Sequence, residues 1–220
     1  MAAARALFRA PRVVCIPGSV RPGSVNQRLL DIAGRRLADR GCEVRRMDLD
    51  KFDLPLFSEE REKKGVSFLP ELKDMMDQAD GIVVASPEYN GSMTPLLVNA
   101  ISWLSRPLPG SDEPMYASFR GKVGLVISAS PGGLGGLRGV SHTRDLLVNL
   151  GTKVIPESVS IGGAFKAFDG DRLVIPAQEQ LLEDSVQRFF EEARNTANQE
   201  AVCHLRHKLA AEYGEIEFAR

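Results

Sequence analysis

The chain has few cysteines, almost no net charge and no long apolar run, and each of these shortages excludes a class of protein. Its 220 residues include only three cysteines, so no disulfide framework is expected and a reducing compartment is the default. The formal net charge is −1, which gives no electrostatic preference for nucleic acid or for an anionic membrane. No apolar run approaches the length of a membrane span. We therefore expect a cytoplasmic protein that binds neither nucleic acid nor membrane.

The three histidines suggest neither a hydrolytic triad nor a metal centre. No serine–histidine–acid set can be assembled around His142, His204 or His207. Cys203, His204 and His207 are close in sequence, but a structural zinc site needs four ligands and the chain has no second cluster. We therefore expect no bound metal.

Apolar, β-branched segments alternate with helical ones along most of the chain. Strands are predicted over 12–16, 43–49, 81–86, 122–128 and 153–155, and a run over 159–164 extends the last one after a break at Pro156. Helical spacing of apolar residues predicts helices from Ser24 onward, over 69–79, from Pro95 to Leu104, over 140–150 and over 177–196. This alternation predicts an α/β fold, with helices on both faces of a parallel sheet.

One domain accounts for most of the chain, and we place it at residues 12–196. Residues 1–11 hold arginines and alanines but no acid, so we expect a disordered leader, with organelle targeting as the alternative. Residues 197–220 predict a C-terminal helical extension. The charged segment 58–67 indicates an exposed excursion. The proline-containing segment 106–118 indicates a long irregular loop, which we expect to border a small-molecule site.

The stretch from Gly18 to Asn26 lies where the first strand gives way to the first helix. The first turn of a helix leaves backbone N–H groups free, and the helix dipole favours an anion beside them. Ser19, Ser24 and Asn26 add neutral donors, and Arg21 adds a fixed positive charge. Neither a P-loop nor a Gly-x-Gly-x-x-Gly fingerprint is present. We interpret the stretch as a site for one phosphate monoester, as in FMN; the plainer alternative is a turn capped by Ser24.

Two further unusual loops follow buried strands. Residues 87–94 include Asn90-Gly91, which favours a tight turn, and residues 129–139 are the most glycine-dense part of the chain. Because the carboxyl ends of parallel strands meet at one edge, we expect the three loops to lie together, where open α/β sheets bind ligands. Backbone N–H groups of the second loop can then donate to a flavin ring. Glycines of the third loop allow backbone to approach a flat ligand.

Plainer explanations exist for the second and third loops. Tyr89 could merely cover the edge of the sheet, and 129–139 could be a flexible linker. Glu88 has three candidate roles: an acid or base, an anchor of its own loop, or a hydrogen-bond partner of a neighbouring subunit. Arg138 and Arg106 are the nearest basic residues that could hold the 2′-phosphate of a second nucleotide, and they do not decide whether that nucleotide carries one.

Four ordered motifs resemble the NADPH-dependent FMN reductase family, the flavodoxin-like group that contains chromate, quinone and azo-dye reductases. They are Gly18-Ser19-x-Arg21-x-x-Ser24-x-Asn26, Pro87-Glu88-Tyr89-Asn90-Gly91, Asn99-Ala100-Ile101-x-Trp103-Leu104-Ser105-Arg106-Pro107 and Ser130-Pro131-Gly132-Gly133-x-Gly135-Gly136. The resemblance covers about residues 12–195. It implies a flavodoxin-like three-layer sandwich with five parallel strands in the order 2-1-3-4-5, bound FMN, and a homodimer or homotetramer. By position it implies FMN contacts at Ser19, Arg21, Ser24, Val25, Asn26, Pro87, Glu88, Tyr89, Asn90, Ser130, Gly132 and Gly133.

The activity implied by this resemblance is reduction of a small-molecule electron acceptor by NADPH or NADH through bound FMN. Quinones, flavins, azo dyes and metal oxyanions such as chromate are the expected acceptors, in a ping-pong reaction that needs no catalytic side chain. The first alternative is a flavodoxin-type electron carrier without its own substrate, although such carriers tend to be strongly acidic and this chain is not. The second is a nucleotide-binding scaffold without a redox role.

Overall fold

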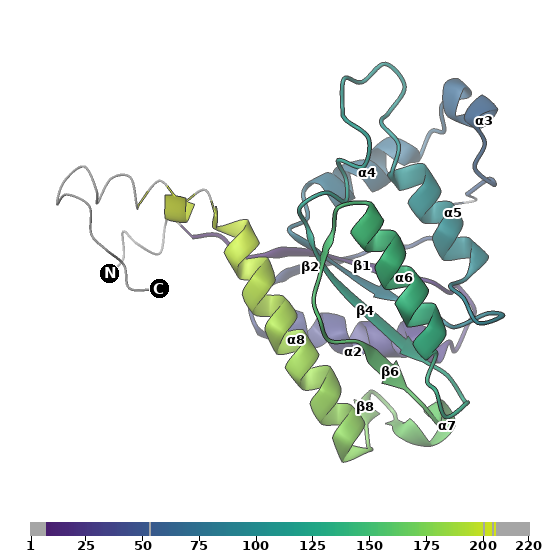
Figure 1. Ribbon diagram of the computed structural model, residues 1–220, viewed down its shortest axis with the longest axis vertical. Helices are drawn as coiled ribbons and strands as arrows, with labels where there is room; N and C mark the ends of the chain where they lie inside the picture. Colours follow the sequence, from purple (N-terminus) through teal and green to yellow (C-terminus); the bar gives the residue numbers. More distant parts are fainter. Residues whose placement is uncertain (1–7, 53, 200, 204, 206–220) are drawn as a thin grey trace.

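The computed structural model describes residues 8–52, 54–199, 201–203 and 205, which form a three-layer sandwich (Figure 1). The central sheet is parallel in the order β2-β1-β3-β4-β5, with β1 at Arg12–Pro17, β2 at Glu43–Arg46, β3 at Gly81–Ala85, β4 at Val123–Ala129 and β5 at Lys153–Val154. Beyond the end of β5, the strand β6 (Val159–Ile161) pairs with β4. The predicted fold class and strand order are confirmed, and so is the interruption of the last strand around Pro156.

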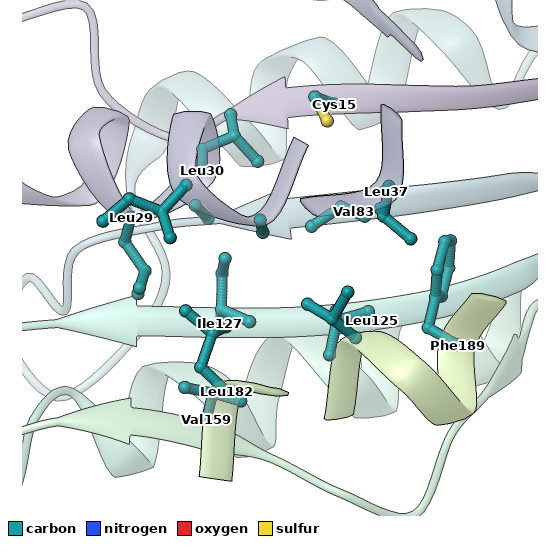
Figure 2. Close-up of a cluster of buried hydrophobic side chains, with 14 of the residues drawn as sticks. Cys15, Leu29, Leu30, Leu37, Val83, Leu125, Ile127, Val159, Leu182 and Phe189 are labelled. Atoms are coloured by element: carbon teal, nitrogen blue, oxygen red, sulfur yellow. The ribbon is translucent and has the colours of Figure 1, made fainter. Parts of the chain in front are cut away.

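Helices cover both faces of the sheet because its central strands β1, β3 and β4 are apolar on both sides. α2 (Val25–Asp39) and α8 (Pro176–Ala197) pack on one face, and α4 (Leu69–Asp77), α5 (Pro95–Leu104) and α6 (Leu137–Asn149) pack on the other. Strand β1 shows the alternation, since Val13 and Cys15 join the first core and Val14 and Ile16 join the second. Figure 2 shows the first core, where leucines of α2 and α8 meet Val83, Leu125 and Ile127.

Several short elements differ from the prediction. The charged excursion contains a helix, α3 (Glu59–Lys64), which is capped by Ser58 and buries no residue. Residues 164–173 form a small helix, α7 (Ala164–Ala167), and an antiparallel hairpin of β7 (Phe168–Asp169) and β8 (Arg172–Leu173). Strand β2 ends at Arg46 rather than Leu49. Met47 and Leu49 are still buried in the second core, and Met47 N–H donates to Cys15 O of β1 at 2.9 Å, just beyond the end of the strand.

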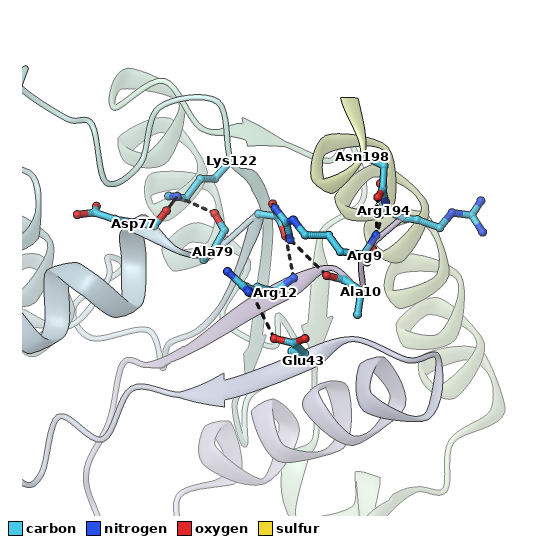
Figure 3. Close-up of polar contacts among 10 residues, drawn as sticks. Arg9, Ala10, Arg12, Glu43, Asp77, Ala79, Lys122, Arg194 and Asn198 are labelled. Carbon is cyan, nitrogen blue, oxygen red and sulfur yellow. Dashed lines mark hydrogen bonds and ion pairs between the residues drawn. The ribbon is translucent and has the colours of Figure 1, made fainter. Parts of the chain in front are cut away.

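The folded unit begins earlier than the predicted limit at residue 12. The Arg9 guanidinium donates to both carboxylate oxygens of Asp80 at 2.6 Å, and the Arg9 backbone N–H donates to Asn198 Oδ1 at 2.9 Å. Figure 3 shows this cluster, in which Arg9 lies beside Asn198 at the end of α8. Residues 8–11 therefore do not belong to a disordered leader, while residues 1–7 lie outside the described part of the chain.

The predicted extension at 197–220 is described only in part. α8 ends at Ala197, and residues 201–203 are helical beyond it. His204 and His207 lie outside the described residues, and no group of three metal-ligating side chains occurs among the residues that are described. Within the same described ranges, none of the helices has the length and apolar character that crossing a membrane requires.

The long loop between α5 and β4 lies at the amino edge of the sheet, away from the three loops of interest. Its end is fixed there, because Gly121 donates to Gly151 O at 2.9 Å and Val123 donates to Asp80 O at 3.0 Å. Arg106, at the start of this loop, forms a bidentate ion pair with Glu62, with Nε to Oε1 at 2.8 Å and Nη2 to Oε2 at 3.1 Å. The expectations that this loop borders the site and that Arg106 holds a 2′-phosphate are therefore wrong for this chain.

Candidate active site

The three loops that follow β1, β3 and β4 meet at the carboxyl edge, as the sequence predicts. Gly18 N–H donates to Ala85 O at 2.7 Å, and Thr94 Oγ1 donates to Gly18 O at 2.7 Å, which joins the first loop to the second. A Cβ at Gly18 would lie 2.5 Å from the side chain of Ser86, so only glycine fits between these strand ends. This close approach brings the first two loops into direct contact.

The first loop leaves backbone donors open. Ser24 caps α2, and its Oγ accepts from Gln27 N–H. Among the described residues, no acceptor is found for the backbone N–H groups of Ser19, Val20, Val25 or Asn26. The side chain of Arg21 is exposed. Across the described residues no carboxylate pairs with it, and this open set of donors suits one phosphate group.

The side chain of Asn26 joins the first loop to the third. It is 2% exposed, its Nδ2 donates to Ala129 O at 2.8 Å, and its Oδ1 accepts from Ala129 N–H at 2.8 Å. The sequence predicts a side-chain donor for an anion at this position. The structure instead commits the side-chain amide to β4, so the backbone N–H is the donor that Asn26 leaves open.

The second loop forms the predicted tight turn. Tyr89 and Ser92 exchange two backbone hydrogen bonds of 2.9 Å, and the residues between them are left-handed, with φ of 53° at Asn90 and 74° at Gly91. Tyr89 is half exposed, and Pro87 O accepts from Ser86 Oγ at 3.1 Å. The N–H groups of Asn90 and Gly91 have no acceptor among the described residues, so the tip of the turn also presents donors.

Glu88 anchors its own loop rather than pointing a free carboxyl at the site. Its carboxylate binds the guanidinium of Arg138 and the backbone N–H groups of Arg138 and Gly139. Partial desolvation alone would raise the pKa of Glu88, but these hydrogen bonds and the Arg138 charge together outweigh it and lower the pKa. A carboxylate that stays ionised near neutral pH is not a general acid. Of the three candidate roles, the anchor is the one that these contacts show.

The third loop is a packed turn and not a flexible linker. Ser130 N–H donates to Ile161 O at 3.0 Å, Ser130 Oγ accepts from Gly132 N–H at 3.1 Å, and Gly132 O accepts from Gly163 N–H at 3.2 Å. A Cβ on Gly162 would lie 2.4 Å from Gly133 O. The glycines therefore allow the loop to approach residues 160–163, a neighbour that sequence reasoning missed although Gly162-Gly163 signals it.

The Asn99 and Trp103 motif holds the segment after β2 against α5. Asn99 Oδ1 accepts from Phe57 N–H at 2.8 Å, and Trp103 Nε1 donates to Pro55 O at 2.8 Å. Trp103 is fully buried. These residues stabilise the fold beside the site and contribute no group to the three loops.

Comparison with known proteins gives consistent matches over most of the chain. A sequence model described as NADPH-dependent FMN reductase matches residues 11–166. The chain is 34% identical over 186 residues to an NAD(P)H-dependent FMN reductase of Pseudomonas aeruginosa, covering 82% of this chain and 90% of that protein. It is 35% identical over 157 residues to a quinone reductase of Escherichia coli, covering 70% and 79%. Among solved structures, the flavoenzyme NAD(P)H:(acceptor) oxidoreductase FerB of Paracoccus denitrificans superposes with a TM-score of 0.73 at 26% identity, covering 85% of this chain and 99% of that one.

Proposed function

Because the chain belongs to the NADPH-dependent FMN reductase family, we propose that its carboxyl edge holds FMN and serves the reduction of quinones by NAD(P)H. The chain is an oxidoreductase that uses FMN and NAD(P)H. The residues that hold the cofactor, the acceptor and the order of the reaction are parts of this proposal.

The observation that carries the proposal is the open set of donors at the start of α2. The N–H groups of Ser19, Val25 and Asn26 have no acceptor in the described chain. Among the same residues, no carboxylate forms an ion pair with Arg21. A phosphate monoester fits this set, because the helix dipole and Arg21 both favour a doubly negative group. Ser19 and Ser24 place two hydroxyl oxygens beside the same turn, and both side chains are nearly buried.

The second and third loops suit the flat part of the same cofactor. The open N–H groups of Asn90 and Gly91 provide donors for ring nitrogen and carbonyl oxygen atoms, and the half-exposed Tyr89 provides an aromatic face. Ser130, Gly132 and Gly133 belong to the third loop, and their small side chains leave room for a ring beside them. FMN supplies the hydride chemistry when bound, and the loops bind and orient it.

Quinones are the proposed acceptor class, because relatives over most of the chain are described as quinone reductases. Flavins, azo dyes and chromate are further candidates, and we propose a ping-pong order in which NAD(P)H and the acceptor use one site in turn. We also propose a homodimer or homotetramer, since Val98 on α5 and Val148 on α6 are exposed apolar side chains of the kind that a second copy covers. A cytoplasmic location would supply NAD(P)H.

The test is the visible spectrum of the purified protein before and after anaerobic addition of NADPH and, separately, of NADH. We expect flavin absorbance that bleaches with nicotinamide and returns on addition of a quinone. Bound flavin that ignores both nicotinamides would favour an electron carrier instead. A protein that cannot be loaded with FMN would overturn the proposal.

A further inference from the structure

Glu88 belongs to the second loop, but it caps a helix that starts in the third. α6 begins after Gly136, which is left-handed at φ 88° and has no side chain to cap the helix. Glu88 Oε2 accepts from the N–H groups of Arg138 at 3.0 Å and Gly139 at 3.1 Å, two of the amides that a helix leaves open at its start. Glu88 therefore supplies the cap from 50 residues away in sequence.

The same carboxylate also forms an ion pair on the helix. Glu88 Oε1 accepts from Arg138 Nε at 2.9 Å and lies 2.7 Å from Arg138 Nη2. The Glu88 side chain is 11% exposed, whereas that of Arg138 is 64% exposed. Each carboxylate oxygen thus has its own partners, and the negative charge lies at the positive end of the α6 dipole.

The backbone geometry shows that the second loop fits closely against α6. A Cβ on Gly139 would lie 3.2 Å from Ser92 O and 3.3 Å from Glu88 Cβ, so a larger residue would push the loop away. One turn further along, His142 Nδ1 and Ser92 Oγ are 3.1 Å apart. The loop is therefore held at both ends of its tight turn, by Glu88 before it and by Ser92 after it.

We propose that Glu88 is a positioning residue, which sets the place of loop 87–92 relative to the flavin ring by capping α6, and that Glu88 and Arg138 balance each other's charge beside that ring. This inference rests on the proposed function, because it takes loop 87–92 to be the loop that faces the ring. It assigns no proton transfer to Glu88.

Charge balance gives a signature that loss of structure alone does not give. Reduced flavin carries more negative charge than oxidised flavin, so a nearby positive charge stabilises the reduced form. Glu88→Gln removes a negative charge and leaves the Arg138 charge unbalanced, which raises the midpoint potential of bound FMN. Arg138→Gln leaves the Glu88 charge unbalanced, which lowers that potential. A purely structural disturbance would have no reason to move the two variants in opposite directions.

The chain offers a matched control at the amino edge. Glu62 and Arg106 form an ion pair at similar distances, although here each arginine nitrogen binds its own carboxylate oxygen, with Nε to Oε1 at 2.8 Å and Nη2 to Oε2 at 3.1 Å. The Glu62 side chain is 17% exposed, close to the value for Glu88. Glu62→Gln therefore removes a comparable ion pair where no flavin is proposed.

The experiment measures FMN affinity by fluorescence titration and midpoint potential by spectroelectrochemistry, for the full chain and for Glu88→Gln, Glu88→Ala, Arg138→Gln and Glu62→Gln. Circular dichroism and urea unfolding check that each variant folds. We expect Glu88→Ala to weaken FMN binding and lower kcat/KM by about tenfold or more, since small displacements of positioning groups can cost up to about a hundredfold. Glu62→Gln should match the unsubstituted chain.

The outcomes separate this inference from the proposed function. If the unsubstituted chain takes up no FMN, the proposed function is overturned and the inference with it. If it binds FMN but the Glu88 variants behave like Glu62→Gln, only the inference is overturned. Potentials of Glu88→Gln and Arg138→Gln that shift in the same direction would likewise overturn the charge balance.

Discussion

The two edges of the central sheet differ in whether their polar groups have hydrogen-bond partners within the described chain. At the amino edge, the side chain of Lys73 is only 3% exposed, and its Nζ lies 3.0 Å from the Glu113 carboxylate. The same Nζ donates to Ser118 Oγ at 2.8 Å and to the carbonyls of Leu104 and Arg106. At the carboxyl edge, the N–H groups at residues 19, 20, 25, 26, 90 and 91 have no acceptor in the described chain. A saturated network holds a long loop in place, whereas open amides remain available to a ligand. We therefore expect substitutions at the amino edge to change mainly stability and substitutions of the open donors at the carboxyl edge to change mainly binding.

Lys122 adds to the network of paired polar groups at the amino edge. Its Nζ donates to Ala79 O at 2.7 Å and approaches Asp77 O at 3.4 Å (Figure 3). Burial lowers the pKa of Lys122, and the nearby Asp77 and Asp80 charges oppose that effect. Asp77 also accepts from Ser118 Oγ at 2.7 Å, which connects Lys122 to the Lys73 group.

The largest expected effect on stability is at the amino edge. Lys73→Met removes the buried cation and leaves Glu113 and the carbonyls without their donor, so we expect the free energy of unfolding to fall by about 3 kcal/mol. FMN affinity of the folded protein should not change. Urea unfolding and fluorescence titration measure the two quantities. Lys51→Met, which removes an exposed ion pair with Asp48, is the control and should change stability by less than about 0.5 kcal/mol.

An intermediate effect is expected where the first two loops touch. Gly18→Ala places a methyl group 2.5 Å from Ser86, so the strand ends must separate, and we expect a loss of about 2 kcal/mol. Because the same contact positions the open amides, FMN affinity should fall as well. Gly110→Ala, at an amino-edge glycine with open space around it, would be strained only by its φ of 77°. If Gly18→Ala and Gly110→Ala bound FMN with equal affinity, the expected difference between the carboxyl and amino edges would be contradicted.

A third substitution should separate binding from stability completely. Arg21→Ala removes an exposed charge that contacts no carboxylate in the described chain, so the free energy of unfolding without FMN should change by less than about 0.5 kcal/mol. FMN affinity should fall by about tenfold or more, because hydrogen bonds to charged groups are worth about 1.5–3 kcal/mol. Arg45→Ala, which removes another exposed arginine, should leave FMN affinity unchanged. Equal affinity in both variants would exclude Arg21 as a phosphate ligand.

The smallest effect is expected from acid. Folding lowers the pKa of Glu88, so its ion pair and hydrogen bonds contribute to stability above the pKa it has in the unfolded chain. That contribution is lost as the pH falls through the lower folded value, so FMN affinity should decline on the acid side of the ordinary glutamate range, about 4.3. Titration of FMN affinity against pH checks this, and Glu88→Gln should flatten the decline. An unchanged decline in that variant would assign it to another group.

Much of the fold could be predicted because apolar spacing changes from strand to helix along the chain. Val13 to Ile16 are apolar at every position, as a strand covered on both faces must be. The hairpin β7–β8 was not predicted, since strands of two residues show no period, although Asp169-Gly170 at its turn is a local signal. Arg9 was misplaced because its partner Asp80 lies 71 residues away.

The place of the candidate site could also be predicted, but not its internal contacts. Parallel strands bring their following loops to one edge, which is a rule of topology and needs no coordinates. The pairings of Glu88 with Arg138 and of Asn26 with Ala129 join segments 50 and 103 residues apart, and no local pattern marks them. Arg106 was misjudged because it belongs to one of the four sequence motifs but lies at the far end of α5, where Glu62 binds it.

The contact between Asn26 and Ala129 amounts to one rung of β-ladder made by a side chain. An asparagine side chain carries the same amide group as a peptide unit, with one carbonyl and donor hydrogens. At Ala129 the neighbouring strand β3 has already ended, while β6 still pairs on the other side. The Asn26 amide takes the vacant place, donating to Ala129 O and accepting from Ala129 N–H as a neighbouring strand would. The first turn of α2 is thereby bonded directly to the sheet, and aspartate at position 26, with no N–H to donate, is a poor substitute.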